Sequence, residues 1–233
     1  MKAKPGEVVR EVLEIGNDGQ LPADFSVRSA DWILKPDGGV EFRTETLADG
    51  SCRPWVRVER YQVKVAGKSK RRFRFEVQVP QDSPAGLCRF ALLIESLADA
   101  ASVAPSGNIS MPIQGRVAVI VYVRIGGAMP NLKVEGMRID TINGQPTPVV
   151  VVRNEGNAHG RPEGVLIGTD AKGQPVDLIV AAMPILPGET RAVPAWPSDR
   201  AEKKPVTITF PLKLTGRVEW EGGSQEIDTT LSP

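Results

Sequence analysis

Few side chains in this sequence have a type and spacing that could carry out catalysis. The only histidine, His159, lies in a turn-like segment at 156–160 without cysteine or carboxylate partners at metal-ligand spacing. We therefore expect a solvated loop histidine and no metal site. Glu163, Asp170 and Asp177 are scattered near turns, and no nucleophile elbow, phosphate-binding loop or Cys-x-x-Cys motif is present. The sequence predicts no catalytic residues, no cofactor and no enzyme activity.

The two cysteines, Cys52 and Cys88, both fall in strand-like segments of the first half of the chain. A disulfide between them would stabilise the fold by about 3 to 4 kcal/mol in the chain-entropy model. It would also indicate an oxidising compartment. The spacing leaves a second interpretation open, in which both residues are buried free thiols.

The densest charge run contains Lys68, Lys70, Arg71, Arg72 and Arg74. On a strand, Arg72 and Arg74 share an outward face, where charge protects a sheet edge against aggregation. An anion site is the alternative, although the run lacks the aromatic side chains that stack on single-stranded nucleic acid. Over the whole chain, 29 Lys and Arg nearly balance 28 Asp and Glu, so we predict no nucleic-acid partner.

A binding role is suggested by the alternation of apolar residues between positions 109 and 125. The apolar positions are Ile109, Met111, Ile113, Val117, Val119, Val121, Val123 and Ile125. This period of two predicts one β-strand of about twice the usual length. From Val117 onward the intervening residues are also largely apolar, which is typical of a strand covered on both faces. We predict that this second half belongs to the core and that Ile109, Met111 and Ile113 are offered to a partner. Alternatively, these three side chains cap the same core.

The remaining pattern predicts an all-β fold. The 23 glycines and 20 prolines interrupt the chain about every ten residues, and helical periodicity is absent. Strands are expected at 7–17, 25–34, 40–42, 55–65, 71–79, 88–94 and 109–125, with a bulge or change of sheet near Glu59 and a loop at 97–108. About seven strands in this length is the count of an immunoglobulin-like sandwich.

A second set of strands follows the linker-like segment 126–130. Strands are expected at 132–139, 149–154, 206–214, 216–220 and 226–231. Asn154-Glu155-Gly156 repeats Asn17-Asp18-Gly19, and the turn at 187–191 resembles the turn at 66–70. We therefore predict two tandem immunoglobulin-like β-sandwiches, residues 1–126 and 127–233.

The start of the sequence bears on where the protein is located. Met1 precedes Lys-Ala-Lys-Pro-Gly directly, which leaves no room for a complete opening strand, and we expect that a secretory leader has been removed. No apolar run approaches the roughly 18 residues that span a bilayer, so no membrane insertion is predicted.

Two features together resemble the PapD-like periplasmic chaperones of pilus assembly. The first is the segment from Ile15 to Pro22, with Trp32 some ten residues later, and the second is the alternating run at 109–113, reached through a long loop. The likeness covers the whole chain, although in the second domain it is only architectural. It implies a periplasmic protein that lends apolar strand residues to pilin-like subunits, which are incomplete sandwiches, and an outer-membrane usher as a further partner. A structural or adhesive module of the cell envelope is the alternative.

The sequence departs from the family pattern at the site that holds the client's terminal carboxylate. The family uses an Arg on the first strand and a Lys on the last strand of domain one. By this resemblance the Arg position falls at or before Met1 and the Lys position near Ala118 or Val119, so Arg116 is the nearest substitute. The charged signature before the sixth strand is also missing at 83–90. The sequence therefore indicates a divergent relative that binds its partner through Ile109, Met111, Ile113 and Arg116.

Overall fold

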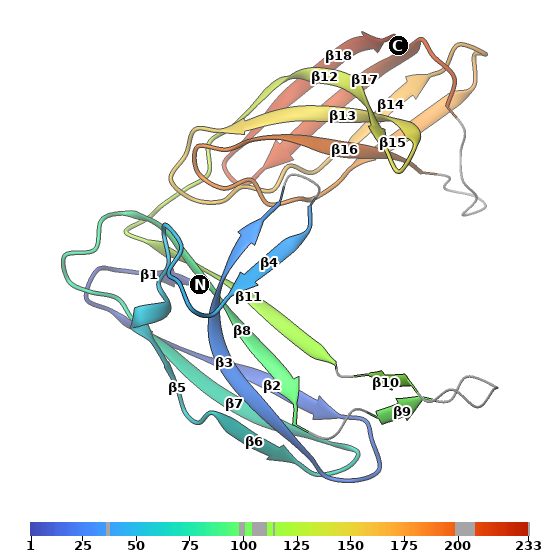
Figure 1. Ribbon diagram of the computed structural model, residues 1–233. Helices are drawn as coiled ribbons and strands as arrows, with labels where there is room; N and C mark the ends of the chain where they lie inside the picture. The colour runs from blue at the N-terminus through green and yellow to red at the C-terminus, as the bar shows by residue number, and fades with distance from the viewer. Residues whose placement is uncertain (36–37, 98–100, 104–110, 114, 199–207, 233) are drawn as a thin grey trace. The chain divides into compact units, whose positions relative to one another are not determined.

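The computed structural model describes residues 1–35, 38–97, 101–103, 111–113, 115–198 and 208–232 (Figure 1). The predicted all-β fold is confirmed, because the only helix among these residues is the three-residue 3-10 turn η1 (Arg53–Trp55). The chain divides into two compact units, Met1–Gly127 and Ala128–Pro233, called unit 1 and unit 2 below. Each unit has its own hydrophobic core.

Unit 1 contains two sheets that enclose its core, and a separate hairpin. The larger sheet has the order β1-β11-β8-β3-β4, with β6 also paired to β3, and the smaller sheet has the order β2-β7-β5. The strands are β1 (Lys2–Ala3), β2 (Val8–Asn17), β3 (Ala23–Leu34), β4 (Val40–Arg43), β5 (Val56–Val58), β6 (Gln62–Val65), β7 (Ser69–Gln78), β8 (Gly86–Ser96) and β11 (Arg116–Ile125). The hairpin pairs β9 (Ala101–Val103) with β10 (Met111–Ile113) in a two-stranded sheet of its own.

The core of unit 1 follows from the alternation of its strands. Phe73, Phe75 and Val77 of β7 are buried against residues of β8, and the rings of Phe75 and Phe90 meet edge to face at 6.1 Å. The predicted change of sheet near Glu59 is confirmed, because β5 pairs with β7 whereas β6 pairs with β3 of the other sheet.

Unit 2 consists of strands in the order β12-β13-β16-β15-β14-β17-β18. They are β12 (Leu132–Ile142), β13 (Gln145–Asn154), β14 (Val165–Thr169), β15 (Pro175–Val180), β16 (Thr190–Ser198), β17 (Leu212–Trp220) and β18 (Gly223–Leu231). β16 changes sheet midway, since its first half pairs with β13 and its second half with β15. The side-chain amide of Gln225 on β18 both donates to and accepts from the backbone of Val134 on β12, each at 3.0 Å. This contact closes the gap between the first and last strands.

The repeated Asn-x-Gly motif has the same structural role in both units. In unit 1 the Asn17 amide donates to the carbonyls of Leu21 and Val65 and accepts from the Gly19 N–H. In unit 2 the Asn154 amide donates to the carbonyls of Ala158 and Ile185 and accepts from the Gly156 N–H. Each asparagine therefore joins the turn after its strand to a second turn that is distant in sequence. The sequence repeat reflects a shared arrangement of hydrogen bonds.

Replacing Asn154 with alanine should lower the free energy of unfolding of unit 2 by about 2 to 4 kcal/mol. The side chain is fully buried, and its removal leaves buried carbonyl groups without donors. Urea denaturation followed by Trp fluorescence measures the effect. Asn157→Ala, which removes one exposed contact to the Met129 N–H, is the control and should change stability by less than about 1 kcal/mol. Equal effects of the two substitutions would contradict this role for Asn154.

Several predicted elements of unit 2 need correction. Strands β14 and β15 are absent from the predicted set, which places no strand between 154 and 206. The predicted break between the strands at 206–214 and 216–220 is wrong, since β17 runs from Leu212 to Trp220. Gly216 has a φ of 153°, and a Cβ there would lie 2.8 Å from the carbonyl oxygen of Val165, so the glycine permits close approach of β14 rather than a turn. Residues 206–207 of the predicted strand lie outside the described residues.

Candidate functional site

The predicted strand at 109–125 is divided into two strands in the structure. β10 pairs with β9, whereas β11 pairs with β8, so the prediction of one continuous strand is wrong. The expected loop at 97–108 likewise contains β9. The division has a physical cause, because Gly115 has no side chain to pack and Pro112 lacks the N–H of a ladder hydrogen bond. Met111 and Ile113 lie in β10, and Ile109 lies outside the described residues.

The apolar row of β11 passes from the core toward the surface. Val121, Val123 and Ile125 are buried, Val119 is half-buried, and Val117 is 62% exposed. The downstream part of the row therefore belongs to the core of unit 1, as expected. At its upstream end, next to the β9–β10 hairpin, the row presents an apolar side chain to solvent. Figure 1 shows the hairpin at this end of β11.

One edge of β11 is available for strand pairing over most of its length. On the side away from β8, β1 pairs in parallel only at Arg124 and Ile125. Tyr122 O accepts from the Met1 amino group at 2.8 Å and Arg124 N–H donates to Met1 O at 3.0 Å, so alternate residues direct their main-chain groups to this side. Ala118 and Ile120 share that direction. No described strand pairs with this edge before Tyr122.

Two cationic residues lie side by side where the edge ends. Lys2 of β1 and Arg124 of β11 are register partners in the parallel pair. Ala3 and Ile125, the next pair, are both buried in the core, so the side chains of Lys2 and Arg124 point to the opposite face of the sheet. The first strand and the last strand of the unit thus each contribute one cation at the same point. Sequence reasoning missed this pair, because the parallel register of β1 cannot be read from two residues.

Comparison with solved structures identifies the fold. A crystal structure of the class 5 fimbriae chaperone CfaA superposes with a TM-score of 0.52 at 11% identity, covering 100% of this chain and 96% of that chain. A chain in a structure of a chaperone–tip adhesin complex of CFA/I fimbriae gives a TM-score of 0.50 at 11% identity, with coverage of 100% and 96%. The chain has the fold of a fimbrial chaperone. No protein-family model matches the sequence, and a search of curated proteins finds no match.

Within this chaperone fold, the predicted site residue Arg116 is held by an ion pair. Its guanidinium contacts the carboxylate of Glu95, the adjacent residue on β8, and Arg28 of β3 donates to the same carboxylate at 2.5 Å. The hydrogen bond from Arg28 lowers the pKa of Glu95, with Arg116 adding to the shift and burial of the carboxylate opposing it. The three side chains therefore join β3, β8 and β11 just where the chain leaves the sheet. This contact persists at neutral pH and is lost as the pH falls through the lowered pKa of Glu95.

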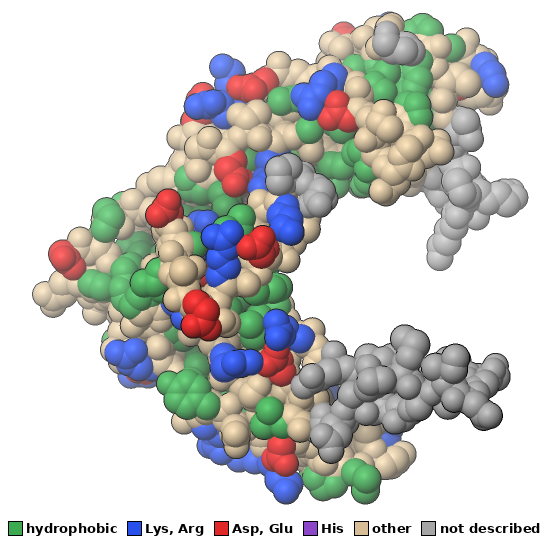
Figure 2. Space-filling model, viewed as in Figure 1, with side chains coloured by type: hydrophobic (Ala, Val, Ile, Leu, Met, Phe, Trp, Pro, Cys, Tyr) green, Lys and Arg blue, Asp and Glu red, His purple; other side chains and the backbone are tan. Residues whose placement is uncertain are grey.

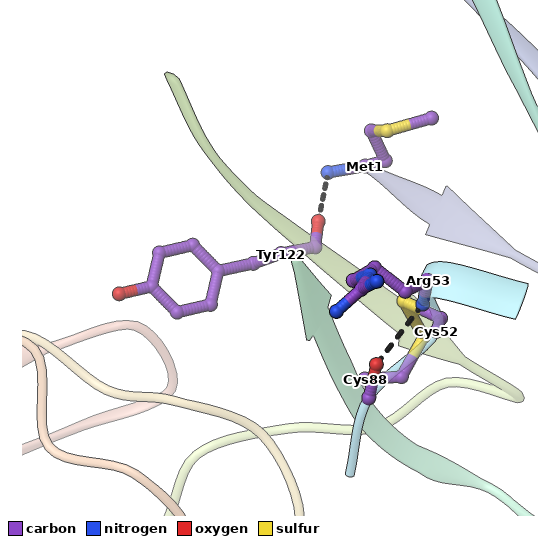
Figure 3. The surroundings of a disulfide bond; sticks show 6 residues. Met1, Cys52, Arg53, Cys88 and Tyr122 are labelled. Carbon is purple, nitrogen blue, oxygen red and sulfur yellow. Dashed lines mark hydrogen bonds between the residues drawn. A yellow bond between two sulfur atoms is a disulfide. The ribbon is translucent and has the colours of Figure 1, made fainter. Parts of the chain in front are cut away.

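The predicted disulfide between Cys52 and Cys88 is present, and Figure 3 shows its surroundings. The two Cα atoms are 5.4 Å apart, and the bridge joins the segment before η1 to β8. Beside it, the Arg53 guanidinium pairs with the buried carboxylate of Asp31 at 3.3 Å and donates to the Thr44 carbonyl at 2.7 Å. The bridge and this arginine together fix the connection from β4 to β5 in unit 1.

The described residues offer little for other chemistry. They contain no group of three or more His, Cys, Asp or Glu side chains that could hold a metal ion. The prediction of a solvated His159 is wrong, because the residue is half-buried and its Nδ1 atom is enclosed by the protein. Asp170 is not simply solvated either, since it accepts bonds from the Lys172 and Gln174 N–H groups and from the Thr209 hydroxyl. None of the described residues forms a helix long and apolar enough to cross a membrane.

Proposed function

We propose that this protein is a periplasmic chaperone that binds pilin-like subunits by β-strand addition along β11 and the β9–β10 hairpin. The observation that carries the proposal is the edge of β11, which no described strand covers before Tyr122. An unpaired edge of this kind binds an extended segment of another protein through main-chain hydrogen bonds. The fold shared with fimbrial chaperones supports the same function, and the protein acts by binding rather than by catalysis.

The geometry also favours one direction for the bound strand. β1 runs parallel to β11 and occupies the end of the same edge. A client strand that runs parallel to β11 ends where β1 begins, so its C-terminal carboxylate comes next to Lys2 and Arg124. Two cations suit a carboxylate, because charge-assisted hydrogen bonds are stronger than neutral ones. Lys2 and Arg124 would then hold the carboxylate, and Arg116 would keep its contact with Glu95.

Apolar side chains provide the second part of the binding energy. Val117 is exposed beside the open edge, and Met111 and Ile113 precede it in β10 at the same spacing of two, as does Ile109 in the sequence. Each such side chain buried in a client contributes roughly 1.5 to 3 kcal/mol. An incomplete sandwich that lacks one strand offers pockets at this spacing. The client therefore receives both main-chain partners and core side chains.

The disulfide and the comparisons support the proposed location and partners. Disulfides persist in oxidising compartments such as the bacterial periplasm, and Cys52–Cys88 is one. One similar structure is described as a chaperone–tip adhesin complex, which supports a pilin-like subunit as the client. An outer-membrane usher would receive the loaded complex.

Replacing Met111 with aspartate should abolish copurification of a client subunit while leaving the protein folded. A charge in an apolar client pocket removes the gain from burial and adds a desolvation cost. Affinity purification from cells that also express the secreted subunits encoded by neighbouring genes measures the loss of the client. Thermal unfolding checks that the variant is folded. Leu47→Asp, a change at a loop leucine that is 61% exposed, is the control and should retain the client.

Two outcomes would contradict the proposal. Unfolding of the Met111→Asp variant would show that the row belongs to the protein's own core. A folded variant that keeps its partner would instead favour a structural or adhesive module, which binds through loops and is indifferent to this substitution.

A further inference from the structure

The outer face of the β2-β7-β5 sheet has a groove that strand addition along β11 does not use. Its volume is about 460 Å³. Two rows of outward side chains run across the strands and form the walls of the groove. The first row is Arg10, Glu76 and Arg57, and the second row is Val12, Arg74 and Glu59. The rows are two residues apart along the strands, a spacing of roughly 7 Å. Glu11, Phe75 and Val58 lie between the rows, and their side chains point to the opposite face of the sheet. The floor of the groove is therefore the sheet backbone, and its apolar surface comes from Val12 and the aliphatic stems of the arginines.

The ion pairs in this groove run along the walls rather than across it. Arg10 pairs with Glu76 at 3.2 Å in the first row, and Arg74 pairs with Glu59 at 3.6 Å in the second. Because each carboxylate is held within its own row, the space between the rows stays open. Val12, which is 45% exposed, adds an apolar wall at one end.

The same face carries an excess of positive charge. Its outward positions hold five cations, Arg10, Arg57, Lys70, Arg72 and Arg74, against three carboxylates, Glu14, Glu59 and Glu76. The whole chain has a formal net charge of only +1, so the excess is local. Among the described residues, neither Arg57 nor Arg72 forms an ion pair. The Arg57 guanidinium donates only to the carbonyls of Pro54 and Val56, both at 3.3 Å.

We propose that this groove binds an acidic peptide segment of a partner protein. An apolar side chain of the segment lies between the two rows, against Val12 and the aliphatic stems of the arginines, and flanking carboxylates meet Arg57 and Arg72. Guanidinium groups bind carboxylates through paired, directional hydrogen bonds, which suits such a segment. Single-stranded nucleic acid is disfavoured because no aromatic side chain on this face is exposed for base stacking. The charged run at 68–74 thus has a binding role in addition to protecting the sheet.

Fluorescence anisotropy with a synthetic peptide tests the proposal. The probe has one phenylalanine flanked on each side by two glutamates, and the protein is the full chain at 50 and 200 mM salt. We expect saturable binding that weakens at higher salt. Arg57→Glu combined with Arg72→Glu should weaken binding at least tenfold, since each exposed ion pair is worth up to about fivefold and reversal adds repulsion. A probe with serine in place of phenylalanine should bind at least about tenfold more weakly.

Controls separate this surface from general charge effects. The control is the Lys133→Glu, Arg153→Glu variant, which changes the net charge by the same amount at register partners on β12 and β13. This variant should bind the probe like the wild type. Equal binding of a lysine-flanked probe, or unchanged binding by the Arg57 and Arg72 variant, would overturn the proposal. Tighter capture by phosphatidylglycerol vesicles than by the peptide would also overturn it, in favour of a lipid surface. The Arg57 and Arg72 variant should keep its client, so the proposed chaperone function is tested separately.

Discussion

Reversing the charges of Lys2 and Arg124 together should weaken binding of a strand with a free C-terminal carboxylate by about a hundredfold. Each cation is expected to donate a charge-assisted hydrogen bond, worth about 1.5 to 3 kcal/mol, to that carboxylate. The loss of both corresponds to at least two factors of ten in the dissociation constant. The two residues are register partners on β1 and β11, at the end of the open edge.

A double-mutant cycle with the ligand tests this prediction directly. The ligand is a synthetic ten-residue peptide of alternating apolar and polar residues, prepared with a free C-terminal carboxylate and as the C-terminal amide. The wild type should prefer the carboxylate strongly, and Lys2→Glu with Arg124→Glu should remove that preference. A variant that still prefers the carboxylate would refute the role of the pair, whatever its overall affinity.

Lys133 and Arg153 provide a matched control for the same experiment. They are a cationic pair of register partners on adjacent strands of unit 2, β12 and β13, which pair antiparallel. Lys133→Glu with Arg153→Glu changes the net charge by the same amount. We expect it to keep the wild-type preference for the carboxylate, because neither residue belongs to β1 or β11, whose edge is proposed to bind the strand.

Removing the disulfide should have the second large effect, on stability. Cys52 and Cys88 are separated by 36 residues, and a loop of that size corresponds to about 3 to 4 kcal/mol in the chain-entropy model. Both residues are buried in the core of unit 1. For a unit of this size, the loss lowers the melting temperature by roughly 10 to 20 °C. The Cys52→Ala, Cys88→Ala variant should therefore melt well below the oxidised wild type.

Calorimetry with and without dithiothreitol distinguishes this effect from simple repacking. Reductant should lower the transition of unit 1 in the wild type and leave the double alanine variant unchanged. Unit 2 contains no cysteine, so its transition is the internal control. A wild type whose two transitions are insensitive to reductant would show that the bridge does not stabilise unit 1.

Local patterns in the sequence were sufficient to predict much of this protein. The alternation of Phe73, Phe75 and Val77 predicted an inward face, because side chains of a strand alternate between its two faces. The Asn17 and Asn154 motifs predicted equivalent turns in two similar units, because an asparagine side chain bonds its own following turn. Both inferences depend on neighbours along the chain, which the sequence contains explicitly.

The candidate site depended on partners that are distant in sequence. Local sequence patterns do not reveal that Lys2 lies beside Arg124 or that Glu95 forms an ion pair with Arg116. They also do not reveal that the predicted strand at 109–125 divides and that β10 pairs with β9. Strand pairing can join residues that are more than a hundred positions apart, as it does for Lys2 and Arg124, and hydrogen bonds between main chains are nearly independent of side-chain type. Sequence therefore predicted most strands of unit 1 and the faces they bury, whereas only the tertiary structure decided which edge of β11 no described strand covers and which charges stand at its end.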